Sequence, residues 1–249
     1  MRYLLFVWLG VSATFVLHAG DVTAAHSPVQ QRIAAAEARI RAQPKSEQGY
    51  NDLAFAYCRL ARDRNDVQLY DKADQAVQTS LKVSPGNFEA KKLHVLVLLG
   101  KGQAAEALKA ASDLQTHNHD DINLWGFLVD ANLALNKLDD AERDAQWILD
   151  LRAGSSLGFT KAARIRELTG DPEGAIEFYE EAARRTAQGD PDERSWLMIQ
   201  NARCQLKLSH NERAEALAKQ ALSVFPDSQL AQDFLSALPA SKQPVAGTR

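Results

Sequence analysis

The sequence contains little of what supports a disulfide scaffold, a redox centre or a nucleic-acid surface. Only two cysteines, Cys58 and Cys204, occur among 249 residues, and aromatic residues make up 7% of the chain. Two cysteines so far apart do not form a spaced metal or redox motif. The formal net charge is −3, so the chain lacks the basic field that nucleic acid or an anionic membrane would attract. We therefore expect no nucleic-acid partner.

Motifs for catalysis and cofactor binding are also missing. The chain has no H-E-x-x-H motif, no P-loop and no G-x-G-x-x-G motif, which would mark a zinc site, a phosphate cradle or a dinucleotide site. It shows no set of acid, base and nucleophile that points to one reaction. The sequence therefore favours a protein that is not an enzyme and that carries no cofactor and no metal.

One short motif leaves a hydrolase open as an alternative. Residues 154–158 spell G-x-S-x-G around Ser156, the pattern of a serine nucleophile on a sharp strand-to-helix turn. No strand is expected before Gly154, and glycine and serine are also the residues that end one helix and cap the next. We interpret the motif as a joint between helices.

A second alternative is a metal site in the segment 117–121. His117, His119, Asp120 and Asp121 place two imidazoles and two carboxylates within five residues. Ligands this close on one turn need a further element to complete the coordination sphere of an ion. We interpret the segment as a polar turn.

The N-terminus has the composition of an export signal. Arg2 gives a positive start, and Tyr3 to Leu17 contains no charged residue, which is the length of a signal-peptide core and short for a membrane span. Alanines at 19, 24 and 25 offer cleavage points. We predict a signal peptide in residues 1–25 and an exported protein, periplasmic or secreted from a bacterium. The alternative is an uncleaved N-terminal membrane anchor.

What the sequence does contain is a repeat. Ala73, Ala107, Ala141 and Ala175 follow one another at equal steps of about 34 residues, and each opens a stretch with the apolar spacing of a helix. A fixed step of this length indicates stacked helical pairs, which bury jointly the apolar faces that no single pair could bury. We predict an all-α solenoid.

The pattern divides residues 28–238 into a leading helix, five helical pairs and a capping helix, followed by a flexible tail at 239–249. The five predicted units are residues 47–87, 88–121, 122–155, 156–189 and 195–228. Two places break the step. Extra chain of about two helical turns falls in the first unit, and we assign it to the inter-helix turn near Asn65. A longer connection at 186–193 stretches the step from Ala175 to Ala214.

These units resemble the tetratricopeptide repeat (TPR) family. The first helix of that repeat carries a large residue, a leucine, a small residue and a tyrosine at fixed positions, and the second carries a small residue, an aromatic and an alanine. The first unit matches the front of the pattern and the fourth unit matches the back: Tyr50, Leu53, Ala54 and Tyr57; Gly170, Ala175, Tyr179 and Ala182.

The resemblance implies a right-handed superhelix whose first helices line a concave, protein-binding groove. Carried over to this chain, the groove positions are Asn51, Phe55, Lys92, Leu96, Phe127, Asp130, Lys161, Arg164, Gln200 and Arg203. Our hypothesis is that the groove binds an extended segment with an apolar stretch and an acidic end. The acidic end would pair with the basic half of the set, Lys161, Arg164 and Arg203. The alternative is that these are ordinary solvated positions.

Together with the predicted export signal, the resemblance implies a non-catalytic interaction scaffold or assembly adaptor of the cell envelope, with a protein or peptide partner. The clamp by which chaperone-binding members hold a carboxylate is not reproduced, because Phe55 stands in place of its asparagine. For the two cysteines we expect buried free thiols. Cys58 and Cys204 lie in the first and last units, and only neighbouring repeats touch in an open array.

Overall fold

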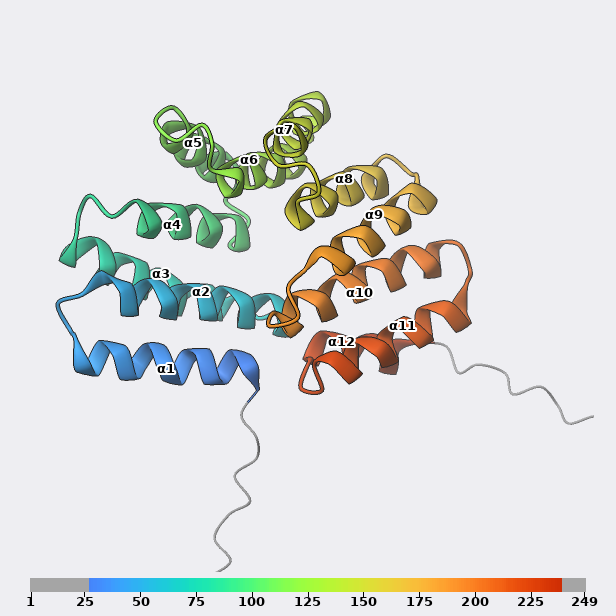
Figure 1. Cartoon of the computed structure of the whole chain (residues 1–249), viewed down its shortest axis with the longest axis horizontal. Coiled ribbons are helices and arrows are strands. Elements are labelled where there is room, and N and C mark those ends of the chain that lie inside the picture. Colours follow the sequence, from blue (N-terminus) through green and yellow to red (C-terminus); the bar gives the residue numbers. More distant parts are fainter. Residues whose placement is uncertain (1–26, 239–249) are drawn as a thin grey trace, which may run out of the picture.

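Twelve helices and no strands make up the part of the chain that the computed structural model describes, residues 27–238 (Figure 1). The helices are α1 (Pro28–Ala42), α2 (Glu47–Arg64), α3 (Gln68–Val83), α4 (Phe88–Gly100), α5 (Ala104–Gln115), α6 (Ile122–Ala134), α7 (Leu138–Leu151), α8 (Ser156–Leu168), α9 (Pro172–Arg185), α10 (Pro191–Lys207), α11 (Asn211–Val224) and α12 (Gln229–Ala237). The predicted export signal at 1–25 and the tail at 239–249 lie outside the described residues.

The helices form five consecutive pairs, α2–α3, α4–α5, α6–α7, α8–α9 and α10–α11, which we number units one to five. Each helix packs on the next one in the chain, with α1 before the first pair and α12 after the last. Side-chain caps begin several helices, as at Asn87, Asp121 and Ser155. The predicted all-α solenoid is confirmed. No helix between residues 27 and 238 is both long and apolar enough to cross a membrane.

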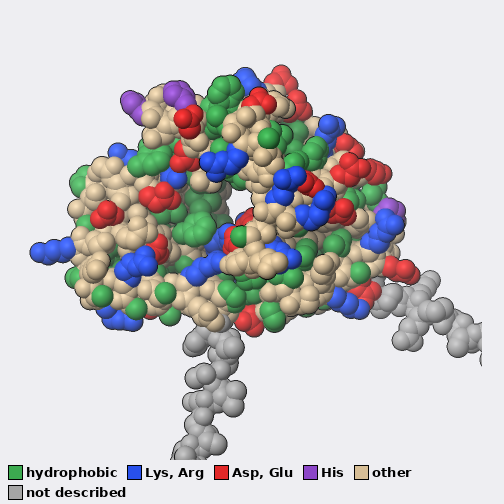
Figure 2. Space-filling model, in the orientation of Figure 1, with side chains coloured by type: hydrophobic (Ala, Val, Ile, Leu, Met, Phe, Trp, Pro, Cys, Tyr) green, Lys and Arg blue, Asp and Glu red, His purple; other side chains and the backbone are tan. Residues whose placement is uncertain are grey.

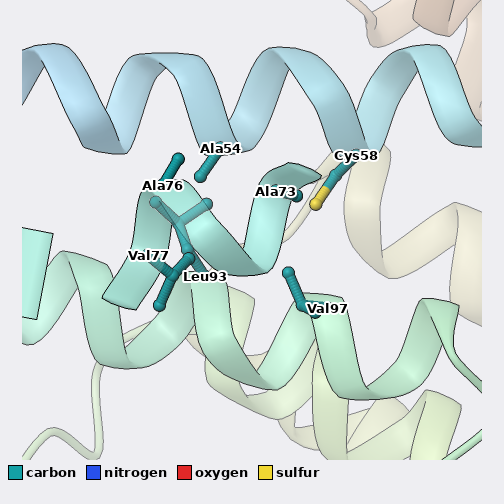
Figure 3. Packing of buried hydrophobic residues seen from close by; sticks show 7 residues of the cluster. All are labelled: Ala54, Cys58, Ala73, Ala76, Val77, Leu93 and Val97. Carbon is teal, nitrogen blue, oxygen red and sulfur yellow. The ribbon is translucent and has the colours of Figure 1, made fainter. Parts of the chain in front are cut away.

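The repeated alanines lie where two helices approach closely. Ala73, Ala107, Ala141, Ala175 and Ala214 are all fully buried. Figure 3 shows the first of these contacts, where α3 packs between α2 and α4 with small side chains at the crossing. A larger side chain there would hold the backbones apart. The fixed step in the sequence is therefore the spacing of these crossings.

The array bends round until its last helices meet its first. Helices α10 and α12 contact α2, and α10 also contacts α1 (Figure 1). Phe225, at the end of α11, is 2% exposed and packs in one apolar cluster with Val29, Leu60 and Leu69. The expectation that only neighbouring units touch was wrong, because the curvature of five units suffices to close a ring.

Both interruptions of the repeat lie at this closure. The extra residues of unit one do not enlarge a turn, as we had expected, but lengthen α2 to 18 residues against 13 for α4. The long connection before unit five ends in an early start of α10, whose first residue is Pro191 and whose length is 17 residues. Each insertion therefore extends a helix toward the opposite end of the ring.

Candidate functional site

The first helices of the units surround a central cavity of about 770 Å³, which we call the channel. Its wall is built mainly by residues of α2, α4, α6 and α8, together with the end of α9, the connection that follows it and the start of α10. Figure 2 shows an opening in the middle of the molecule, with hydrophobic, basic and acidic side chains around it. A cavity of this size accommodates several residues of an extended chain or a small molecule.

Most of the predicted groove positions lie on the channel wall. Those that line it are Asn51, Phe55, Lys92, Leu96, Phe127, Asp130, Lys161 and Arg164. Gln200 and Arg203 are not among the lining residues: Gln200 is buried, and the Arg203 guanidinium donates to its Oε1 at 3.2 Å. Because ring closure turns the start of α10 toward the channel, Glu193 and Trp196 line the wall there instead.

Units one to three supply a large part of the apolar wall. Phe55 of α2 is 42% exposed although it faces a cavity, and Leu96 of α4 and Phe127 of α6 line the same space. The Arg59 guanidinium lies 5.6 Å from the centre of the Phe55 ring, within the range of a cation–π contact. An exposed aromatic ring inside a concave site offers contact area at small entropic cost, since it has only two side-chain torsions.

The basic part of the wall, with which our hypothesis pairs the acidic end of a partner, already contacts an acid of this chain. Lys161 Nζ lies 2.6 Å from Asp130 Oδ2, and an Arg164 guanidinium nitrogen donates to Asp130 Oδ1. Burial lowers the pKa of Lys161, and the Asp130 carboxylate offsets only part of that effect. Two cations share one carboxylate, so hydrogen-bond donors remain for a further acceptor.

Two other predicted groove residues have structural partners. Lys92 Nζ donates to Asp121 at 2.8 Å and pairs with Glu89 at 3.0 Å. Burial lowers the pKa of Lys92, but the hydrogen bonds to Asp121 and Glu89 outweigh it and raise the pKa overall. The Asn51 side chain accepts a hydrogen bond from Ser80 Oγ at 2.7 Å. Both side chains therefore tie neighbouring helices together at the wall.

Sequence reasoning missed the ion pairs that close the ring. Arg59 Nε lies 2.6 Å from Asp192 Oδ2, a second Arg59 nitrogen lies 2.7 Å from Asp190 Oδ1 and a third lies 3.1 Å from Glu193. Arg62 pairs with Glu193 at 2.6 Å. With Arg32, which pairs with Asp190 and Asp192 at 3.2 and 2.9 Å, these residues form what we call the closing network.

Burial and opposite charge shift the carboxylate pKa values of the closing network in opposite directions. Burial raises the pKa of Asp192, but Arg59 and Arg32 outweigh it, so the pKa is lowered overall. The pKa of Glu193 is lowered in the same way, with burial opposed by Arg62 and Arg59. Burial raises the pKa of Asp190, and Arg59 compensates only in part. The two interruptions of the fixed step were the only sequence signal for this network.

Ser156, the serine of the G-x-S-x-G motif, lies on the channel wall at the start of α8. Its Oγ donates to the carbonyl of Ala182 at 2.9 Å and lies 2.7 Å from Thr186 Oγ1. The preceding Ser155 caps α8, and Gly154 has a φ of 83°, the conformation that favours glycine at a helix end. The motif thus forms a joint between two helices.

The histidines of the segment 117–121 bond within their own turn. His117 Nδ1 lies 2.8 Å from Thr116 Oγ1, and His119 Nδ1 lies 2.9 Å from the Gln115 amide nitrogen. Asp121 caps α6. Within residues 27–238 no three histidine, cysteine, aspartate or glutamate side chains are placed to hold one metal ion. The segment is a polar turn between units two and three.

Solved TPR structures share this fold. A thermophilic TPR protein of Thermus thermophilus is 19% identical with a TM-score of 0.61, covering 74% of this chain and 98% of that one. The type IV pilus biogenesis factor PilW is 17% identical with a TM-score of 0.52, covering 83% and 90%. The human IFIT1 dimer with m7Gppp-AAAA is 15% identical with a TM-score of 0.65, covering 83% of this chain and 49% of that one.

At these identities the likeness establishes the fold and not the activity. No family model matches the sequence, and no curated protein matches it. The class that the fold defines is the TPR solenoid, in which paired helices stack into a superhelix and present one concave wall. In this chain that wall is closed into a channel.

Proposed function

We propose that the protein is a non-catalytic scaffold that binds a peptide or protein segment in its channel. The observation that carries the proposal is the exposed Phe55 on a concave wall that also holds Leu96, Phe127 and the Lys161–Asp130–Arg164 cluster. Apolar contacts with a few oriented polar groups are the common composition of a binding site.

The charges of the wall favour a polypeptide over a polyanion. Acidic side chains alternate with basic ones along the wall, so a phosphate backbone would meet repulsion as well as attraction. Lys161 and Arg164 share the single Asp130 carboxylate, which leaves one positive charge to pair with a ligand. A segment with apolar side chains and one carboxylate therefore fits best. The acidic residues of the wall are Asp52, Glu89, Asp130, Asp190 and Glu193.

The experiment for this proposal uses two arginines as a matched pair. Arg164 lines the channel, whereas Arg203, on the first helix of the next unit, does not. Proteins captured from the native cell envelope by the wild type would be compared with those captured by Arg164→Glu and by Arg203→Glu. We expect Arg164→Glu to bind at least about tenfold more weakly, which corresponds to a loss of about 1.4 kcal/mol. Equal capture by all three proteins would contradict channel binding.

We further propose that the scaffold acts in the cell envelope as an assembly adaptor. The uncharged segment from Tyr3 to Leu17 supports export, and the shared fold with a pilus biogenesis factor supports an assembly role. N-terminal sequencing of the protein purified from its own cells tests the export step. We expect the chain to begin near His26, whereas a start at Met1 would favour the membrane-anchored alternative.

A further inference from the structure

The contact between units one and five is separate from the contacts that hold each unit together. Apart from the cluster around Phe225, the apolar clusters of the array join helices of one unit and of its neighbours in the chain, as in the cluster of Ala54, Val77 and Leu93. In a stacked repeat each unit draws its stability from itself and from its sequence neighbours. The ring contact can therefore break while the helices stay folded.

Three groups of atoms make up this ring contact, which we call the latch. The first is the closing network between α1 and α2 on one side and the start of α10 on the other. The second is the apolar seat of Phe225 among Val29, Leu60 and Leu69. The third is Asp63, whose carboxylate accepts hydrogen bonds from Ser228 Oγ at 2.8 Å and from the backbone N–H of Gln229 at 3.2 Å.

Some of the latch contacts come from the parts of the chain that depart from the repeat. Arg59, Arg62 and Asp63 lie in the last turns of the lengthened α2, and Asp192 and Glu193 lie in the added first turn of α10. A helix gains about 1.5 Å in length for each residue added, so each insertion extends its helix across the gap between the two ends. Arg59 is the thirteenth residue of α2 and lies within the length of α4, whereas a repeat without these insertions would lack the latch contacts of Arg62 and Glu193.

Some latch residues are also channel residues. Arg59, Arg62, Glu193 and Trp196 line the cavity, and the Arg62 guanidinium lies 4.6 Å from the centre of a Trp196 ring. A ligand group that binds any of these side chains competes with the latch contact. Occupancy of the channel and closure of the ring are therefore linked, and each changes the equilibrium of the other.

We propose that the latch opens and closes the channel while the five units stay folded. Opening separates the start of α10 and the end of α11 from α1 and α2, with small rotations at the joins between units absorbing the movement. A partner segment that lies within a longer chain then enters through the side and is encircled on closure. This inference goes beyond the proposed function, because opening is a property of the chain alone.

The test measures the distance between spin labels on the two sides of the latch. Cysteines introduced at the exposed positions Ala35 of α1 and Gln232 of α12 carry the labels. The native Cys58 and Cys204 are buried, and burial raises their pKa to about 12 and about 11, so they react slowly at neutral pH. We expect one short distance in the otherwise wild-type chain.

The opening variant is Arg59→Glu with Arg62→Glu, which places acids against Asp192 and Glu193. We expect the label distance to become longer and broader while helicity by circular dichroism stays unchanged. Exposed arginines outside the latch provide the matched control, Arg143→Glu with Arg184→Glu, which should leave the short distance in place. The charge swap Arg59→Asp with Asp192→Arg should restore part of the short-distance population.

Two results would overturn the proposal. An unchanged distance in the double variant would show that the network does not hold the ring. A longer distance that is accompanied by loss of helicity in the double variant and in the milder Asp192→Asn variant alike would show that opening and unfolding are one event. Should the double variant lose helicity, the milder Asp192→Asn change decides: opening with full helicity supports a latch, and opening only with unfolding, or no opening, refutes it.

Discussion

Contacts between consecutive units and the contact between the first and last units are built from different chemistry. Consecutive units meet through fully buried alanines and aliphatic side chains, as at Ala175 and Leu197. The first and last units meet through arginines and carboxylates and through the Phe225 ring in its apolar seat. The first kind of contact repeats along the chain with small ion pairs beside it, such as Lys161–Asp130. Within residues 27–238, a network of three arginines and three carboxylates lies only at the ring contact.

The difference indicates what each contact contributes. Apolar burial stabilises by roughly 25 cal/mol per Å² and depends little on pH. A half-buried ion pair loses hydration free energy that its attraction only partly returns, so its net contribution is smaller and varies with conditions. The stacked units therefore form a stable frame, and ring closure is the part of the structure that solution conditions can change.

The largest expected effect compares two buried side chains, one in each kind of contact. Leu197→Ala leaves a cavity between units four and five and should cost about 2–5 kcal/mol, seen as a lower Tm of the whole array. Phe225→Ala removes a ring of similar burial, but the latch can open and relieve the loss. We expect a smaller change in Tm together with a longer spin-label distance. If Tm fell equally in the two variants and the spin-label distance did not change, the latch would be as integral to folding as the stacked units, which contradicts this prediction.

The next effect tests the close crossings of the frame. Ala175→Leu inserts three carbons between α9 and its neighbours and should cost about 1–3 kcal/mol by overpacking. Ala216 is exposed on α11, so Ala216→Leu is the matched control and should leave Tm nearly unchanged. Thermal denaturation followed by circular dichroism measures both. A Tm for Ala175→Leu equal to that of wild type would show that the crossing is looser than the structure has it.

A smaller effect is the response of the latch to acid. The closed state lowers the pKa values of Asp192 and Glu193, so the closed state binds fewer protons than the open one. Their contribution is complete above their ordinary pKa values and is lost as pH falls through the lowered ones, below about pH 4. Asp190, whose pKa is raised, opposes this change with one group against two. We expect acid to lengthen the spin-label distance before helicity falls; the reverse order would contradict this.

The smallest expected effect concerns the two thiols. Both cysteines are free and buried, as the sequence predicted, and the raised pKa values leave little thiolate at neutral pH. We expect the native protein to react slowly with a chromogenic disulfide reagent at about pH 8 and to release both thiols at once in denaturant. Since Cys204 packs with Ala163 and Tyr179 rather than on the latch or the channel wall, Arg59→Glu with Arg62→Glu should leave the reaction rate of Cys204 unchanged.

Much of the frame was readable from the chain because local rules determine it. The recurrence of Ala73, Ala107, Ala141 and Ala175 reports a packing requirement that each unit meets with its immediate neighbours. Residues carried over from the repeat pattern, such as Phe55 and Phe127, lie on the channel wall as predicted for the same reason. Gln200 and Arg203 did not, since the position of α10 depends on where the ring ends as well as on the repeat.

The sequence by itself determined the helices, their pairing and the small residues at their crossings, because each of these is a contact between segments close in the chain. Only the tertiary structure decided that the two ends of the array meet and that Arg59 pairs with Asp192, which lies 133 residues further along the chain. Small rotations between units accumulate along the whole array, and their sum, which no local pattern records, sets the distance between its ends. The same accumulated rotation brings the lengthened end of α2 next to the early start of α10, where the ring closes.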